Sequence, residues 1–198
     1  MNQFSILDNL VTSNNGYLLT SQVLENGISK PVLADYVRKR NLERVAHGVY
    51  LAKDAWTDYL YQLYLQNKRV VFSHETALFL HGLMEREPSF FSVTVPAGYN
   101  ATHLRKRNVR VYQVKQDIFC LGQTELQTSF GNTVCVYDME RTICDILRHK
   151  EKMDIQFFQY AMKEYMADSR KNLPRLMSYA KFFRLETIVR TYTEVTNY

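Results

Sequence analysis

Two short helices and a hairpin follow one another within residues 16–51, and this succession constrains the fold more than any other feature of the chain. Thr20 is predicted to cap the first helix, and Gly27 to end it, because glycine adopts the left-handed conformation of a helix end at little cost. Ser29 is predicted to cap the second helix, with Pro31 in its first turn, where a missing N–H breaks no hydrogen bond. The residues that recur at helical spacing are Val23, Leu24, Leu33, Tyr36, Val37 and Arg40.

The hairpin is expected to form from strands at residues 42–45 and 49–51, joined across His47 and Gly48. Helix, turn, helix and hairpin in this order predict a winged helix-turn-helix, in which the second helix enters the major groove of DNA. Small residues would approach base edges, and cations would contact phosphates. The candidate DNA contacts are Thr20, Ser21, Gln22, Ser29, Lys30, Pro31, Ala34, Arg38, Lys39, Arg40, Arg44 and His47.

Positive charge is concentrated in the same segment. Residues 28–53 hold six Lys or Arg and two acidic residues, a local charge of +4, whereas the whole chain carries +5. This distribution favours contact with phosphates at the predicted winged module. The alternative is a small helical domain whose basic face is simply solvated.

The length of 198 residues accommodates two domains, and we expect a DNA-binding domain at residues 1–66 and a second domain at 67–198. No run of apolar residues is long enough to cross a membrane, and the first ten residues lack the pattern of a signal peptide, so a cytoplasmic protein is expected. The three cysteines show no C-x-x-C spacing and have apolar neighbours, which indicates buried thiols rather than a disulfide or a zinc site. No metal and no cofactor is predicted.

The second domain is predicted to combine a small mixed sheet with a helical C-terminal half, which makes the fold class α+β. A connecting helix is expected at residues 54–66, a helix near 73–83, and strands at 70–72, 90–95, 109–114 and 133–137. Apolar residues spaced by three or four then predict helices at 139–147, 155–165, 173–183 and 185–195.

Catalytic patterns in the second domain are weak. His74 and His81 are seven residues apart, whereas histidines that share a zinc ion on one helix face are four apart. Asp138 is better placed as an N-cap, and Asp145 can pair with Arg141 one helical turn away. Gln113 and Lys115 imitate the polar-x-Lys element of restriction-type nucleases, but no acidic pair accompanies them. No catalytic residue is predicted.

A second segment is rich in cations, and burial in a core cannot be the reason for them. Residues 101–116 hold five Lys or Arg and no acid, with Arg105, Lys106, Arg107 and Arg110 close together. The segment is either a solvated loop and strand edge, protected from aggregation by its charge, or a second contact site for nucleic acid or an acidic partner.

The order of these parts resembles the AbiEi family, the antitoxins of type IV abortive-infection toxin-antitoxin systems. The motifs that carry the resemblance are Gly16 and Tyr17, Arg44, residues 47–50 (His-Gly-Val-Tyr), residues 73–78 (Ser-His-Glu-Thr-Ala-Leu) and residues 137–145 (Tyr-Asp-Met-Glu-Arg-Thr-Ile-Cys-Asp). The resemblance extends over nearly the whole chain, and its specificity lies in the combination of these motifs in order.

The resemblance implies a DNA-binding repressor that acts on inverted repeats in the promoter of its own toxin-antitoxin operon. It also implies an antitoxin that counteracts a nucleotidyltransferase-fold toxin without a stable complex. A monomer in solution that assembles cooperatively on DNA fits this function, with no membrane partner. The alternative is a nuclease-like, DNA-processing enzyme that uses the winged module for targeting.

Overall fold

The computed structural model describes residues 2–195, which form two compact units. The first unit runs to Lys68 and takes in Gln127–Val134, the turn that joins two strands of a later sheet. The second unit holds Arg69–Leu126 and the chain from Cys135 onward.

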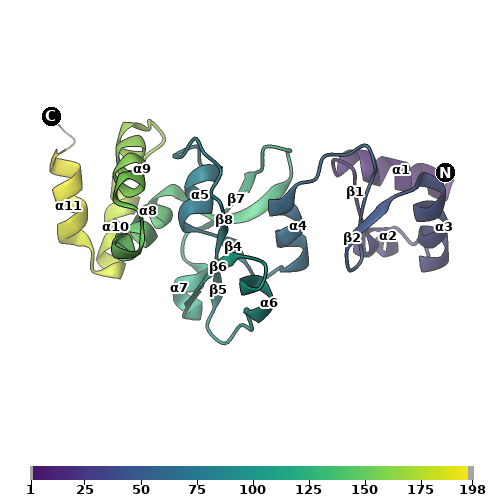
Figure 1. Cartoon of the computed structure of the whole chain (residues 1–198), viewed down its shortest axis with the longest axis horizontal. Helices are drawn as coiled ribbons and strands as arrows, with labels where there is room; N and C mark the ends of the chain where they lie inside the picture. Colours follow the sequence, from purple (N-terminus) through teal and green to yellow (C-terminus); the bar gives the residue numbers. More distant parts are fainter. Residues whose placement is uncertain (1, 196–198) are drawn as a thin grey trace. The chain divides into compact units, whose positions relative to one another are not determined.

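The first unit contains a winged helix-turn-helix (Figure 1). Its elements are α1 (Gln3–Ser13), β1 (Tyr17–Leu19), α2 (Thr20–Glu25), α3 (Lys30–Arg40), β2 (Glu43–Ala46), β3 (Val49–Leu51) and α4 (Tyr59–Gln66). The strands form an antiparallel sheet in the order β1-β3-β2. Its core contains apolar residues from α1, α2, α3 and β1 and from the segments next to α3: Leu7, Leu18, Val23, Ile28, Leu33, Tyr36 and Leu42.

Local predictions for this unit need three corrections. Thr20 is the first residue of α2 rather than its cap; Leu19 occupies the cap position without a side-chain hydrogen bond. Leu24 is 45% exposed and lies outside the core. The connecting helix starts at Tyr59 rather than residue 54, because Asp58 caps it by accepting a hydrogen bond from the Tyr61 N–H.

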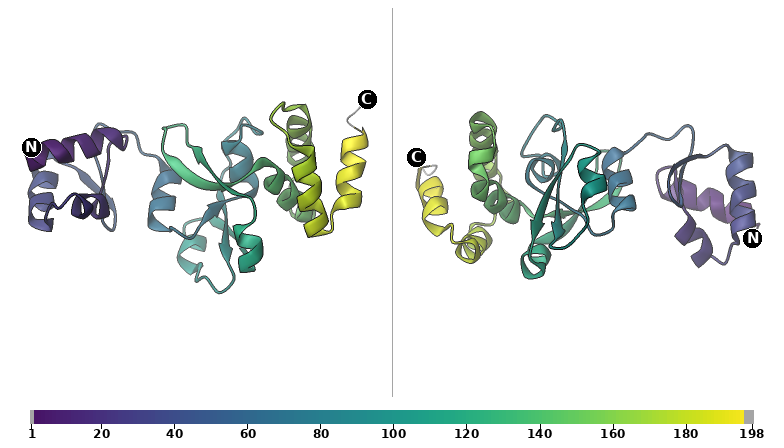
Figure 2. Two further views of the ribbon diagram at one scale, coloured as in Figure 1. Left: turned by 180° about the vertical axis from the view of Figure 1, so that it is seen from behind. Right: turned by 60° about the horizontal axis from the view of Figure 1, so that its bottom comes forward.

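The second unit joins a five-stranded sheet to a group of helices (Figure 2). Its elements are β4 (Val71–Phe72), α5 (His74–Leu80), β5 (Phe91–Pro96), α6 (Thr102–Arg105), β6 (Val109–Val114), α7 (Gln116–Cys120), β7 (Gln123–Gln127), β8 (Thr133–Tyr137), α8 (Met139–Arg148), a 3₁₀ turn (Lys150–Lys152), α9 (Ile155–Ala167), α10 (Leu173–Phe183) and α11 (Glu186–Val195). The strand order is β6-β5-β4-β8-β7. β4 is antiparallel to β5 and parallel to β8, and β5 is parallel to β6.

The sheet is therefore mixed and the C-terminal half helical, which confirms the predicted α+β class. α8 is buried along almost its whole length and packs with α9 and α10 around Ile143, Ile146, Phe158 and Leu176. None of the helices, within the residues described, is both long and apolar enough to span a membrane.

Candidate nucleic-acid interface

α3 has one buried and one open face. Leu33 and Tyr36 are buried in the core of the first unit, whereas Pro31, Ala34 and Arg38 are exposed. Gly27 adopts φ +71° in the turn before α3, as predicted for a residue that ends a helix. The helix thus presents small residues and cations away from its own core, the arrangement that a recognition helix needs.

One carboxylate organises the cations on this open face. Asp35 accepts hydrogen bonds from Arg38 Nη2 at 2.6 Å and pairs with Lys39 Nζ at 2.8 Å. These two contacts, that with Lys39 first, lower the pKa of Asp35. The two cationic side chains remain 80% and 59% exposed, so their groups stay accessible to phosphates. Asp35 orients both side chains, and the three groups together carry a net charge of +1.

Arg40 is placed differently from its neighbours. Its Nη2 lies 2.7 Å from Oδ2 of Asp8 in α1, and the Tyr36 hydroxyl donates to Oδ1 of the same carboxylate at 2.8 Å. Arg40 therefore joins the end of α3 to α1. Asp8 is 32 positions away in the sequence, and no local pattern pointed to it.

Two further candidates lie on the wing, which contacts the start of α2. Arg44 and His47 are exposed on the β2–β3 hairpin, whose register shifts between Arg44 and Ala46. The Thr20 N–H donates to the carbonyl of Gly48 at 2.8 Å. A side chain at Gly48 would meet Thr20 Oγ1 at 3.3 Å, at a φ of +71° that favours glycine. Thr20 thus positions the turn of the wing.

The other candidates lie at the start of the two helices. Ser21 and Lys30 are exposed, and Gln22 accepts a hydrogen bond from Asn14 Nδ2 at 2.9 Å. Ser29 occupies the predicted cap position of α3, but its side chain makes no capping hydrogen bond. Its exposed hydroxyl is available to solvent or to a ligand.

The first unit also contains a buried polar cluster around Asp58, which was not predicted from the sequence. Asp58 Oδ2 accepts hydrogen bonds from Thr128 Oγ1 at 2.6 Å and from Asn132 Nδ2 at 2.8 Å. The Asp58 N–H donates to the Tyr17 hydroxyl at 3.0 Å. The polar groups of this cluster satisfy one another inside the protein, as buried polar groups generally do.

Residues 73–78, which carry part of the family resemblance, hold α5 against β5. Thr76 Oγ1 accepts from the Ser92 N–H, and Glu75 Oε2 accepts from the Ser92 hydroxyl. Nε2 of His81, just after α5, lies 2.7 Å from the Tyr137 carbonyl, so it carries a proton and donates. These residues make structural contacts. No group of three or more His, Cys, Asp or Glu in the described part of the chain is placed to hold a metal ion.

Residues 137–145 fasten α8 to its neighbours. Asp138 caps α8, as predicted, and accepts a hydrogen bond from the Tyr179 hydroxyl of α10. Glu140 accepts from the Asn172 N–H at the start of α10. Arg141 is fully buried and pairs with Asp145 at 3.0 Å, the ion pair that the sequence predicted.

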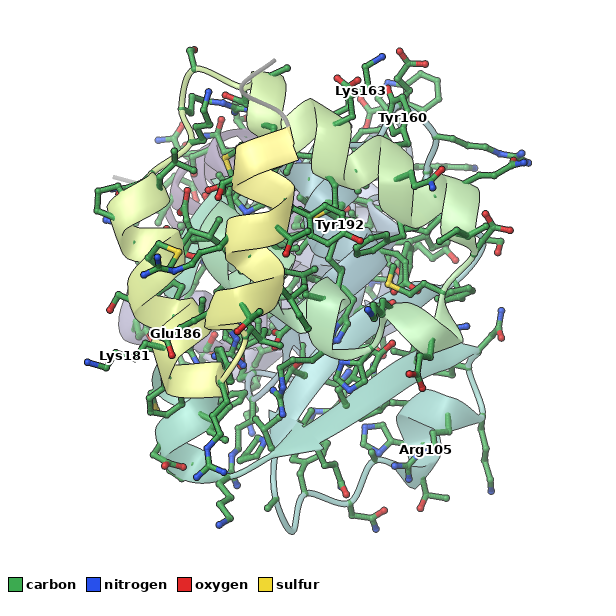
Figure 3. The ribbon with its side chains drawn as sticks, turned by 90° about the vertical axis from the view of Figure 1, so that its left-hand side faces the viewer. Arg105, Tyr160, Lys163, Lys181, Glu186 and Tyr192 are labelled. Carbon is green, nitrogen blue, oxygen red and sulfur yellow. The ribbon has the colours of Figure 1, made fainter. Side chains whose placement is uncertain are left out.

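The basic segment divides into two parts. Arg105, Lys106 and Arg107 are exposed at and after α6, on a part of the second unit separate from the helices that carry Lys163 and Lys181 (Figure 3). Arg110, on β6, instead pairs with the buried carboxylate of Glu75 at 2.7 Å.

The cysteines differ in environment. Cys144 is buried, and burial raises the pKa of its thiol to about 12, which keeps it protonated. Cys135 is half-buried, whereas Cys120 is exposed, so the expectation of a buried thiol is wrong for Cys120. All three are free thiols.

Comparisons with known proteins agree with this architecture. Residues 3–86 match the family model described as transcriptional regulator, AbiEi antitoxin N-terminal domain. The crystal structure of the RV2827C protein from Mycobacterium tuberculosis has a similar fold, with a TM-score of 0.54 and 13% sequence identity over 90% of this chain and 72% of that one. At this identity the likeness concerns the fold alone. A search of curated proteins gave no match.

The matched residues run from α1 past α5, so they include the whole candidate DNA surface and the motif at residues 73–78. The resemblance seen in the sequence is thereby confirmed over residues 3–86, which match the AbiEi antitoxin N-terminal domain model of transcriptional regulators.

Proposed function

We propose that the first unit binds inverted repeats in the promoter of its own toxin-antitoxin operon and represses transcription there, in the cytoplasm. The observation that carries this proposal is the open face of α3, where Arg38 and Lys39 remain exposed although Asp35 orients both. Exposed cations beside small residues suit a helix that approaches base edges between two phosphate backbones.

The contacts have different proposed roles. Lys30, Lys39 and Arg44 would bind phosphates, because they flank the open face or lie on the wing. Ala34 and Arg38 would lie nearest to base edges. Pro31, Ser21, Gln22, Ser29, Thr20 and His47 would line the same surface. Arg40 would act through its ion pair with Asp8, by fixing α3 against α1, rather than by direct contact.

A band-shift titration with the chain's own upstream DNA tests this assignment. Lys30→Gln and Arg44→Gln should each weaken binding to operator and random DNA alike, and each should flatten the salt dependence by about one unit of slope. Arg38→Gln should instead reduce the ratio of operator to random affinity, at a cost of about 1 to 3 kcal/mol. Lys163→Gln and Lys181→Gln, exposed lysines of the second unit, are the matched controls. Equal binding by all five variants at every salt concentration would contradict the interface.

We further propose that the second unit counteracts a nucleotidyltransferase-fold toxin, and that this activity is separable from DNA binding. The chain would be a monomer in solution that assembles cooperatively on the inverted repeats, with no stable toxin complex. Growth rescue tests the separation: the Lys30→Gln, Arg38→Gln, Arg44→Gln triple variant should protect cells from the toxin while it fails to repress. Loss of protection by a folded triple variant would show that antitoxicity requires DNA binding.

The competing function is a nuclease-like enzyme targeted by the winged module, for which Gln113 and Lys115 at the end of β6 gave the only sequence motif. Such an enzyme would need clustered carboxylates to hold Mg²⁺. Incubation of the upstream DNA with and without Mg²⁺ separates the two functions. A band shift that is independent of metal supports the repressor, and nicking that depends on Mg²⁺ supports the enzyme.

A further inference from the structure

A polar cavity of about 250 Å³ lies in the second unit between the end of α8, the start of α5 and strand β6. At roughly 30 Å³ for each water molecule, it has room for a small polyatomic ion and several waters. None of the proposed DNA contacts lines it, and neither do the clustered cations Arg105, Lys106, Arg107 and Arg110.

One wall of the cavity is a fixed aromatic group. The ring of His74 stacks on Tyr112 with centroids 3.5 Å apart and planes at 10°, and the ring of His149 lies 5.0 Å from both at steep angles. His74 has a φ of +50°, a backbone conformation that residues other than glycine adopt at some cost. The surrounding structure therefore holds this ring in place.

The hydrogen bonds of the wall leave one ring nitrogen unused. His149 Nδ1 lies 2.9 Å from the Asp145 carbonyl, so it carries a proton and donates. Burial holds the pKa of His74 well below its usual value, and its neutral Nε2, 3.2 Å from His149 Nδ1, is an acceptor. Nε2 of His149 has no partner among the residues that the structure describes.

The charges beside this wall do not balance. Asp145, whose side chain is 3% exposed, pairs through Oδ2 with Arg141 at 3.0 Å and faces Arg148 through Oδ1 at 3.7 Å. Two guanidinium groups thus share one carboxylate. Arg148, 31% exposed, stacks on Phe183 and makes no hydrogen bond within the described chain. Nη2 of Arg141 is buried and also has no acceptor there.

We propose that this cavity binds a phosphate group, either inorganic phosphate or the phosphate of a mononucleotide. Arg148 supplies the charge and a planar set of donors that matches phosphate oxygens. His149 Nε2 accepts a hydrogen bond from the P–OH group of the monoanion. An anion here also neutralises the positive charge that remains because Arg141 and Arg148 share the single carboxylate of Asp145.

The competing explanation is that Arg148 only complements the C-terminus of α8, where cations are favourable. Calorimetric titration of the full chain in chloride buffer, at constant ionic strength, distinguishes the two. Inorganic phosphate should bind saturably, and Arg148→Gln should weaken binding by at least tenfold. Arg148→Lys should recover part of the loss because it restores the charge. Lys150→Gln, which removes an exposed cation two residues away and outside the cavity, should bind as the wild type does.

Two further arms complete the test. Arg38→Gln should leave phosphate binding unchanged, which separates this cavity from the DNA surface, and Arg148→Gln should leave the operator band shift unchanged. Tighter binding of AMP or UMP than of phosphate would assign the cavity to a nucleotide, and equal binding would assign it to free phosphate. Absence of saturable binding, or identical binding by wild type and Arg148→Gln, would overturn the proposal.

Discussion

Arg110 Nη1 lies 2.7 Å from Oε1 of Glu75, and the guanidinium group stacks on the ring of Phe90 at 3.9 Å. The other oxygen of Glu75 accepts a hydrogen bond from the Ser92 hydroxyl at 2.6 Å. Glu75 is buried, so Arg110 compensates a charge that water cannot reach freely. One of the five cations in the basic segment therefore has a structural role.

Arg110 and the three exposed cations should therefore contribute differently to the free energy of unfolding. Arg110→Gln should lower the free energy of unfolding by about 1 to 3 kcal/mol, because Glu75 loses a charged hydrogen bond. Replacing Arg105, Lys106 and Arg107 together by Gln should change it by only a few tenths of a kcal/mol, as expected for exposed charges. Urea unfolding followed by circular dichroism measures both. Equal losses would mean that the ion pair contributes nothing specific.

The same triple variant tests whether the exposed cations act on a partner. Because it should stay folded, we expect it to lose antitoxicity in a growth-rescue assay while its operator affinity stays at the wild-type level. The Lys163→Gln, Lys181→Gln double variant is the control, since those lysines lie elsewhere on the second unit (Figure 3). Full rescue by the triple variant would mean that the segment is an ordinary solvated loop.

Removing a carboxylate should strengthen DNA binding. Asp35→Asn abolishes the pairs with Arg38 and Lys39 and leaves both cations to phosphates, so operator and random DNA should both bind several-fold more tightly. The salt dependence should also steepen. Stability should fall little, because exposed ion pairs on a helix surface contribute little to the free energy of unfolding. Unchanged or weaker binding would place Asp35 outside the interface.

Asp168 should make stability depend on pH in acid. The hydrogen bond from Arg170 lowers the pKa of Asp168 from the usual 3.8 to about 2. A folded-state pKa below the unfolded one means that the stabilisation is complete above the unfolded pKa and is lost as pH falls toward the folded one. Asp168→Asn should thus cost stability at pH 6 and progressively less between about pH 5 and pH 2. Urea unfolding across this range measures it, and a difference that does not vary with pH would contradict the assignment.

The buried cluster around Asp58 should be sensitive to a single change. Asp58→Ala leaves Thr128 and Asn132 without their acceptor and removes the cap of α4, so we expect a loss of about 2 to 4 kcal/mol. Asp54→Ala, an exposed carboxylate four residues earlier, should have almost no effect. Thermal unfolding compares the two variants. Similar midpoints would show that the cluster does not stabilise the fold.

Sequence patterns predicted what depends on local spacing. α3, the hairpin strands, the strands at 109–114 and 133–137 and the C-terminal helices all have apolar residues at a regular period, and Asp138 and Arg141 lie one turn from their partners. α1 and β1 were not predicted, and neither were the short α6 and α7, whose four and five residues are too few to show a period.

Contacts between distant residues could not be predicted in this way. Arg40 matched the period of the core face of α3 and the composition of a DNA contact equally well, and only Asp8, from another helix, decides its position. Glu75 and Arg110 are 35 positions apart, and the charge of the basic segment gave no hint that one member had a buried partner. Such partners are determined by the tertiary fold and not by the local sequence.

The Asp58 cluster also sets an order of events during synthesis. Asp58 has its partners 70 and 74 positions later in the chain, at Thr128 and Asn132. A ribosome that works from the N-terminus therefore releases the helices of the winged module well before the residues that satisfy Asp58. Contacts so far apart in sequence form late, because the intervening chain must first be brought back. A nascent chain that ends before residue 127 would contain α3 but would lack the partners of Asp58, so the module would reach its final form only after the β7–β8 turn has been synthesised.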